Sequence, residues 1–138
     1  MYNTDLNTPK KELDHRLRLF QRQLAENRID AAIILQNADL YYFTGTIQQS
    51  NLYVPVEGTP ILFVKKSVER AKAESNLQRI VPFGSPKMIP DLLKENGYEI
   101  PGRIGMELDV LPANLYVGYR EIFNKAEFKD VSVPIRLI

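Results

Sequence analysis

The spacing of apolar positions near the start of the chain predicts a helix followed by a buried strand. Four apolar residues recur at intervals of four, three and four and therefore share one helix face: Leu13, Leu17, Phe20 and Leu24. The hydroxyl of Thr8, followed by Pro9, predicts the start of this helix, and Asn27 predicts its end. Residues 30–35 then form a short run that is apolar on both faces. Such a run is typical of a strand in a helix-covered sheet.

An aromatic stretch follows this strand. Asn37 is expected to cap a short helix that runs through Tyr42, and Gly45 is expected to end it. Of the three consecutive rings at residues 41–43, two are expected in the core, because aromatic side chains bury large apolar areas. The loop at residues 46–50 carries no charged residue. We expect this loop to project from the sheet edge and to contact a partner or ligand.

The rest of the pattern alternates between strands and helices. Further strands are expected at residues 51–56, 61–64, 79–82, 103–107 and 127–133, and helices are expected to begin at Ser67, Ser85 and Pro112. The turn at residues 57–60 makes an antiparallel hairpin of the first two of these strands. The helix after Pro112 is predicted to carry Leu115, Tyr119 and Ile122 on one face, and residues 134–138 are expected to leave the last strand.

This order of elements predicts an α/β fold. A helix, a strand and a hairpin come first, and alternating helices and strands follow. We therefore expect a three-layer-like sandwich with a mixed, about six-stranded sheet flanked by helices. Residues 1–8 are predicted to be a loose N-terminus, and residues 9–138 a single domain.

Composition narrows the classes of partner. The chain has 138 residues, of which 44% are hydrophobic and 25% charged, as in an ordinary globular domain. The net charge is +1 and no basic block exceeds two lysines, which argues against a nucleic-acid partner. No apolar run approaches the roughly 20 residues that span a bilayer, and no membrane partner is expected. The chain has no cysteine, and its polar start lacks a signal-peptide core, so we expect a cytoplasmic protein.

Candidate chemistry is sparse. The single histidine, His15, is predicted on the exposed face of the first helix, and no ligand set surrounds it in the sequence. No Gly-x-Ser-x-Gly elbow, cysteine nucleophile or phosphate-binding loop is present. Five acids remain that tertiary structure could gather: Asp30, Asp39, Glu57, Glu107 and Asp109. The first strand lacks the internal acid that a ribonuclease-H-type nuclease needs, and Glu107 is expected to make a structural hydrogen bond or to be a solvated charge. We therefore expect no catalytic residue and no metal ligand in this chain.

Several segments resemble, in order, the N-terminal domain of the creatinase/prolidase/aminopeptidase P family of pita-bread metallopeptidases. Residues 37–45 resemble the family's Asn-x-x-Tyr-Leu/Phe-Thr/Ser-Gly element, and residues 103–107 resemble its Ile-Gly-Val-Glu strand. Residues 58–62 resemble its hairpin, and residues 130–136 resemble the segment before its interdomain linker. The resemblance covers nearly all of the chain from Lys10 onward and implies the family's N-terminal fold, which contains a ribonuclease H-like motif.

The resemblance implies a function that the residues alone do not. It implies the non-catalytic N-terminal domain of a Xaa-Pro dipeptidase or aminopeptidase, which supports dimerisation and shapes the active site of a catalytic domain. In the family, that C-terminal domain holds two divalent metal ions, such as manganese, cobalt or zinc, through two Asp, one His and two Glu. We expect it to be absent from this chain, which alone would hold no cofactor. The implied partners are the catalytic domain, a second subunit and a proline-containing peptide.

The family's loop that reaches the partner subunit's active site matches positions in or beside residues 44–53. The candidate substrate-proximal or interface residues are Tyr42, Thr44, Thr46, Gln48, Gln49 and Tyr53. Two alternatives remain open. The chain could be the N-terminal domain of another pita-bread hydrolase, such as a creatinase-like enzyme, or it could be a freestanding α/β interaction module.

Overall fold

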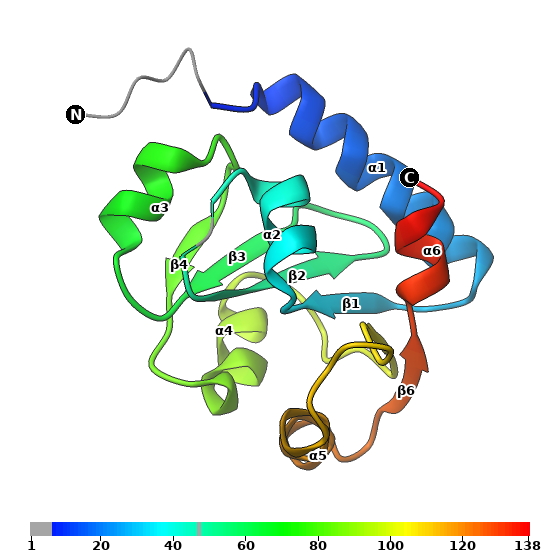
Figure 1. Cartoon of the computed structure of the whole chain (residues 1–138). Coiled ribbons are helices and arrows are strands. Elements are labelled where there is room, and N and C mark those ends of the chain that lie inside the picture. The colour runs from blue at the N-terminus through cyan, green and yellow to red at the C-terminus, as the bar shows by residue number, and fades with distance from the viewer. Residues whose placement is uncertain (1–6, 47) are drawn as a thin grey trace.

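The computed structural model describes residues 7–46 and 48–138 as a six-stranded sheet between two layers of helices (Figure 1). The helices are α1 (Lys10–Glu26), α2 (Asn37–Thr44), α3 (Val68–Glu74), α4 (Ile89–Glu95), α5 (Ala113–Ile122) and α6 (Ser132–Arg136). The strands are β1 (Ala31–Ile34), β2 (Ser50–Pro55), β3 (Ile61–Val64), β4 (Ile80–Pro82), β5 (Arg103–Met106) and β6 (Glu127–Asp130). Most of the N-terminal segment predicted to be loose, residues 1–6, lies outside the described residues.

The sheet is mixed, as predicted. Its strand order is β4-β3-β2-β1-β5-β6. β1 lies at its centre, antiparallel to β2 and parallel to β5. β2 and β3 form the predicted antiparallel hairpin, and the two outer pairs, β3–β4 and β5–β6, are parallel. β1 therefore has an antiparallel neighbour on one side and a parallel neighbour on the other.

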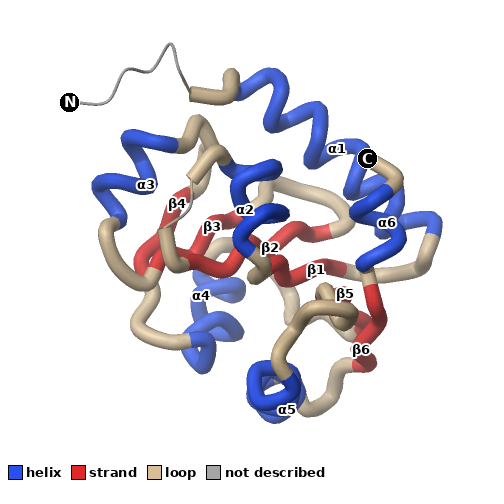
Figure 2. Tube along the Cα trace, viewed as in Figure 1, coloured by secondary structure: helices blue, strands red, loops and turns tan. Residues whose placement is uncertain are grey.

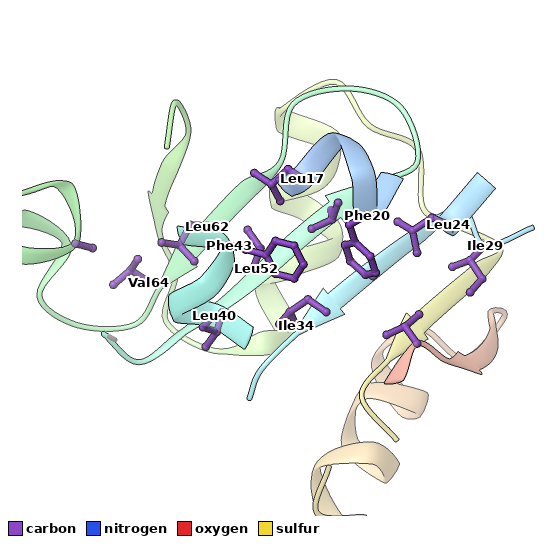
Figure 3. Close-up of a cluster of buried hydrophobic side chains, with 14 residues drawn as sticks. Leu17, Phe20, Leu24, Ile29, Ile34, Leu40, Phe43, Leu52, Leu62 and Val64 are labelled. Atoms are coloured by element: carbon purple, nitrogen blue, oxygen red, sulfur yellow. The ribbon is translucent and has the colours of Figure 1, made fainter. Parts of the chain in front are cut away.

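One layer of the core lies between the sheet and the helices α1, α2, α3 and α6. All four apolar residues predicted on the first helix face are buried, and Leu17, Phe20 and Leu24 belong to this layer of the core. Figure 3 shows Phe20 of α1 beside Phe43 of α2, with their ring centroids 5.2 Å apart and nearly parallel. Leu52 and Leu62 of the central strands point into the same cluster. This packing binds α2 to α1 and to the sheet.

The second layer of the core lies under α4 and α5, on the opposite face (Figure 2). Neighbouring strand residues point to opposite faces, so Ile33 contributes to this layer while Ile34 contributes to the first. This explains why β1 is apolar on both faces. Leu115, Tyr119 and Ile122 of α5 lie on one face, as predicted, but Tyr119 is buried whereas Leu115 is 42% exposed.

The end of the chain differs from the prediction. The last strand stops at Asp130, and residues 132–136 form α6 instead of continuing the strand and then leaving it. Asp130 Oδ1 accepts the Ser132 N–H at 3.0 Å and the Ser132 hydroxyl at 2.5 Å, which turns the chain after β6. Val131 packs onto Gly105, where a Cβ would lie only 2.2 Å from the valine Cγ1. The glycine therefore lets the start of α6 approach the sheet.

The first helix does not begin with the predicted hydroxyl cap. Pro9 occupies the N-cap position of α1, and no side chain among residues 7–46 and 48–138 caps that helix. Ser67 precedes α3 with a positive φ of 58° and makes no side-chain cap bond either. Asn7 donates to the Ala73 carbonyl at 2.8 Å, and Asn76 donates to the Thr8 carbonyl at 2.7 Å. These bonds tie the segment before α1 to the α3 region. Within the part of the chain that the structure describes, no helix is both long and apolar enough to cross a membrane.

Candidate functional site

The helix α2 connects the carboxyl end of β1 to the loop before β2. Its N-cap is Gln36 rather than the predicted Asn37, and the Gln36 side-chain oxygen accepts the Asp39 N–H at 2.9 Å. Gly45 ends the helix as predicted, with a φ of 79° and an N–H bond of 2.8 Å to the Tyr41 carbonyl. A residue with a side chain is strained at that φ, so the position favours glycine.

Only one of the three consecutive rings lies in the core. Phe43 is fully buried, whereas Tyr41 is 56% exposed and Tyr42 is 37% exposed. The prediction that two rings are buried is therefore wrong. Successive helical residues turn by about 100°, so Leu40 and Phe43 share the buried face of α2 while residues 41 and 42 turn away from it. The sequence alone did not reveal which face α2 presents to the sheet.

Arg16 of α1 holds the exposed Tyr42 in place. Its guanidinium carbon lies 4.3 Å from the centre of the Tyr42 ring, and it donates to the Tyr42 carbonyl at 2.7 Å. Arg16 also donates to Glu12 Oε1 at 3.0 Å. A cation over an aromatic face stabilises the pair and limits the ring's rotation. The α2 surface therefore presents two exposed tyrosines, one of them oriented by α1.

The six predicted site residues occupy different environments. Thr44 and Thr46 are buried, and the Thr44 hydroxyl donates to the Leu40 carbonyl at 2.6 Å. Tyr53 lies in the opposite core layer beside Tyr98, and burial raises the pKa of its phenol far above the usual range. Gln49 is exposed and Gln48 is half-buried. Ile47, between Thr46 and Gln48, lies outside the described residues. Tyr42 and the two glutamines are thus the members of the set with surface access.

Glu74, at the end of α3, binds the loop that follows α2. Its Oε1 accepts the Thr46 hydroxyl at 2.6 Å and the Gln48 side-chain amide at 3.2 Å. Arg70 lies 3.8 Å from its other oxygen. The sequence contained no signal for these contacts, because Glu74 has the pattern of an ordinary helix-surface acid. The uncharged loop is therefore held by a carboxylate from another element.

Glu107, just after β5, binds the segment that leads into α2. Its side chain is almost completely buried, with 1% exposure. Its Oε1 accepts the Leu35 N–H at 2.6 Å, and its Oε2 accepts the Gln36 N–H at 3.1 Å. Burial raises the pKa of Glu107 to about 8, with the neighbouring Asp39 carboxyl adding to the rise, and the two backbone N–H bonds only partly offset it. Of the two predicted roles for Glu107, the structure shows the hydrogen bond.

Three of the five candidate acids share one small cleft. Asp39, Glu107 and Asp109 line a space of about 180 Å³, together with Ser132 and Arg136. Asp30, by contrast, lies before β1 and accepts the Arg103 N–H at 2.9 Å. In residues 7–46 and 48–138, no three histidine, cysteine or acidic side chains are arranged to hold a metal ion. The described residues therefore do not fit the two divalent metals that the resemblance implies for the whole enzyme.

A different concave surface lies on the opposite layer, between the start of α4 and α5. This groove has a volume of about 570 Å³, and Pro86, Pro90, Leu115, Tyr119 and Ile122 form its mainly apolar lining. None of the predicted site residues lines it. The groove is thus independent of the α2 surface.

Comparisons with known proteins agree with this fold. A proline dipeptidase from Streptococcus pneumoniae TIGR4 is 25% identical, with a TM-score of 0.76 over 88% of this chain and 94% of that chain. The prolidase from Pyrococcus horikoshii OT3 is 26% identical, with a TM-score of 0.76 over 88% of this chain and 34% of that chain. The creatinase/prolidase N-terminal domain of an X-Pro dipeptidase from Streptococcus pyogenes shares the fold at 20% identity, with a TM-score of 0.75 over 90% of this chain and 98% of that chain.

These matches differ in length. The chain spans about a third of the Pyrococcus prolidase and nearly all of the two streptococcal chains. No curated protein matches the sequence. The family model for the creatinase/prolidase N-terminal domain matches residues 16–138, which is most of the chain. The chain therefore belongs to the creatinase/prolidase N-terminal domain family.

Proposed function

We propose that this chain is the non-catalytic N-terminal domain of a Xaa-Pro metallopeptidase, either a dipeptidase or an aminopeptidase. The observation that carries the proposal is the fold match over 88% of this chain to a proline dipeptidase and to a prolidase at 25% and 26% identity. The fold itself is compatible with other pita-bread hydrolases, including creatinase-like enzymes. The proposed substrate class therefore rests on the two named matches and not on the fold.

Within such an enzyme, the domain supports dimerisation and shapes the active site of the catalytic domain. The α2 surface and the loop after it are our candidates for this contact. Tyr41 and Tyr42 offer exposed aromatic area, and Gln48 and Gln49 offer amide groups that can bind a peptide or a second subunit. The buried Thr44, Thr46 and Tyr53 would act only by supporting that surface.

The metal chemistry of the proposed enzyme belongs to its catalytic domain. Two divalent ions, such as manganese, cobalt or zinc, would be held there, as the resemblance to the pita-bread metallopeptidases implies. The proposed partners are this catalytic domain, a second copy of the enzyme and a proline-containing peptide substrate, in the cytoplasm. The proposal assigns no bond-breaking step to this chain.

Hydrolysis assays with and without the catalytic domain test the proposal. The pure 138-residue chain should not hydrolyse a Xaa-Pro dipeptide in the presence of manganese, and a polypeptide that continues into a catalytic domain should. Clear turnover by the pure chain would contradict the non-catalytic role. A stop codon directly after Ile138 in the gene would favour the interaction-module alternative. A downstream domain without the Asp, Asp, His, Glu and Glu metal ligands would favour a non-catalytic binding protein with the same two-domain organisation.

A further inference from the structure

The end of β1 depends on Glu107 for two of its backbone hydrogen bonds. The N–H groups of Leu35 and Gln36 follow the last residue of the strand, and both point at the Glu107 carboxyl, at 2.6 Å and 3.1 Å. Gln36 is also the N-cap of α2, and its side chain accepts the Asp39 N–H. A continuous set of hydrogen bonds therefore runs from Glu107 through Gln36 into the first turn of α2.

A second carboxyl, that of Asp39, faces Glu107 from this first turn. Its side chain is hydrogen-bonded to Glu107, and both residues line the same cleft. Two adjacent carboxyls resist ionising together, so one proton is shared between them. Burial favours the neutral form of Glu107. The shared proton is therefore assigned to Glu107, which donates it to the Asp39 carboxyl.

We propose that Glu107 is a positioning residue for α2, whose protonated carboxyl joins the end of β1 to Asp39, so that loss of its proton displaces the first turn of the helix. The exposed Tyr41 and Tyr42 would move with that turn. The link to a contact surface rests on the proposed function, but the proton-dependent positioning of α2 does not.

The other charged groups around the cleft do not neutralise an ionised Glu107. Arg136 is the only cation among the described residues that line the cleft, and it is paired with Asp109 at 2.5 Å. Asp130, at the end of β6, accepts the Leu108 N–H at 3.1 Å and bonds to Ser132. Each additional anion in the cleft would oppose ionisation of Glu107. An ionised Glu107 would thus face Asp39 without a free cation beside it.

Nuclear magnetic resonance of the 138-residue chain between pH 5.5 and 9.5 tests this inference. The carbon signal of the Glu107 carboxyl should titrate with a midpoint near pH 8. The amide nitrogen signals of Leu35 and Gln36 and the ring signals of Tyr41 should change with the same midpoint. The Glu107→Gln variant retains an acceptor oxygen and a donor N–H but has no titrating proton, so these amide and ring signals should stay at their low-pH positions.

Two variants separate the specific pair from the general charge of the cleft. Asp39→Asn should lower the Glu107 midpoint by about one pH unit, because it removes the facing negative charge. The double variant Asp109→Asn, Arg136→Gln removes the ion pair of the same cleft as a unit and should shift the midpoint much less. A Glu107 midpoint below pH 6, an equal shift in both variants, or unchanged Leu35 and Tyr41 signals across the titration would overturn the inference. None of these readouts requires peptidase activity, so a failure here is distinct from a failure of the proposed function.

Discussion

The two ends of α2 are each held by a glutamate, but in different ways. At the start, Glu107 comes from the sheet, is 1% exposed and binds backbone N–H groups. At the end, Glu74 comes from a surface helix, has a side chain that is 19% exposed and binds the side chains of Thr46 and Gln48. A buried carboxyl that binds the backbone sets the path of the chain, and its burial raises its pKa. A partly exposed carboxylate that binds side chains instead holds the loop after α2.

This contrast has an energetic basis. A buried N–H that loses its acceptor costs about 1–3 kcal/mol, because water cannot replace the lost bond. Hydrogen bonds and ion pairs near the surface contribute less, because water competes for both partners. The start of α2 is therefore expected to be part of the cooperative fold, and the loop after α2 is expected to respond locally to change.

The largest effect is expected for Glu107→Ala. This change leaves the Leu35 and Gln36 N–H groups without their acceptor. The free energy of unfolding, measured by urea denaturation at pH 7, should fall by about 2–4 kcal/mol. Glu107→Gln is the matched control and should lose less than half of that, because the amide keeps an acceptor and a donor. Equal losses in the two variants would show that bulk rather than hydrogen bonding matters at this position.

The next effect is a fall in stability between about pH 4.5 and pH 8. The pKa of Glu107 is raised in the folded state from 4.5 to about 8, so the folded chain binds more protons than the unfolded chain between these values. Its contribution to stability is therefore fully present below about pH 4.5 and is lost as pH rises through 8. The unfolding free energy of the wild type should fall relative to that of Glu107→Gln by up to about 1.4 kcal/mol per pH unit. Parallel curves for the two proteins would contradict this assignment.

A smaller effect is expected at the other end of α2, for Glu74→Ala. Loss of the bonds to Thr46 and Gln48 should lower the unfolding free energy by about 0.5–1 kcal/mol. Hydrogen exchange at residues 48–50 should accelerate, while exchange at Leu35 and Gln36 should not change. Glu74→Gln keeps an acceptor and serves as the control. If Glu74→Ala were as damaging as Glu107→Ala, the proposed difference between the two ends would not hold.

The smallest effect on stability is expected for Gln48→Ala and Gln49→Ala, within about 0.5 kcal/mol. In a full-length enzyme, the same changes should alter dimerisation or the preference for substrate length. Analytical ultracentrifugation and kinetics with a Xaa-Pro dipeptide and a longer peptide measure these properties. Lower thermal stability with unchanged kinetics would assign the loop to the scaffold instead.

Patterns within single elements were sufficient to predict much of the fold. The buried face of α1 and the burial of β1 on both faces were predicted correctly, because local periodicity indicates which side of an element packs against the core. The end of α2 was readable from Gly45, since a helix often ends where a glycine adopts a positive φ. α6 was missed because alternating residues 127–133 also fit a strand, and only the Asp130–Ser132 turn decides between the two.

The candidate site was less predictable than the fold. The loop after Gly45 was identified, but the burial of Thr44, Thr46 and Tyr53 was not. Glu107 was expected to make a structural hydrogen bond or to be a solvated charge, but its partners were not predicted, and Glu74 was not singled out. The position of a side chain along an element does not show which distant group it contacts in the folded chain. Long-range hydrogen bonds depend on that contact, so they could not be predicted from the sequence.

The sequence by itself determined the order of elements, the mixed sheet and the membership of the family, because these depend on local patterning and on motifs in a fixed order. Only the tertiary structure decided how α2 is held. Leu35 and Glu107 are 72 residues apart in the chain, and Thr46 and Glu74 are 28 apart. The pairing of β1 with β5 brings the first pair together, and burial there changes the proton affinity of a carboxyl that the sequence shows only as an acid.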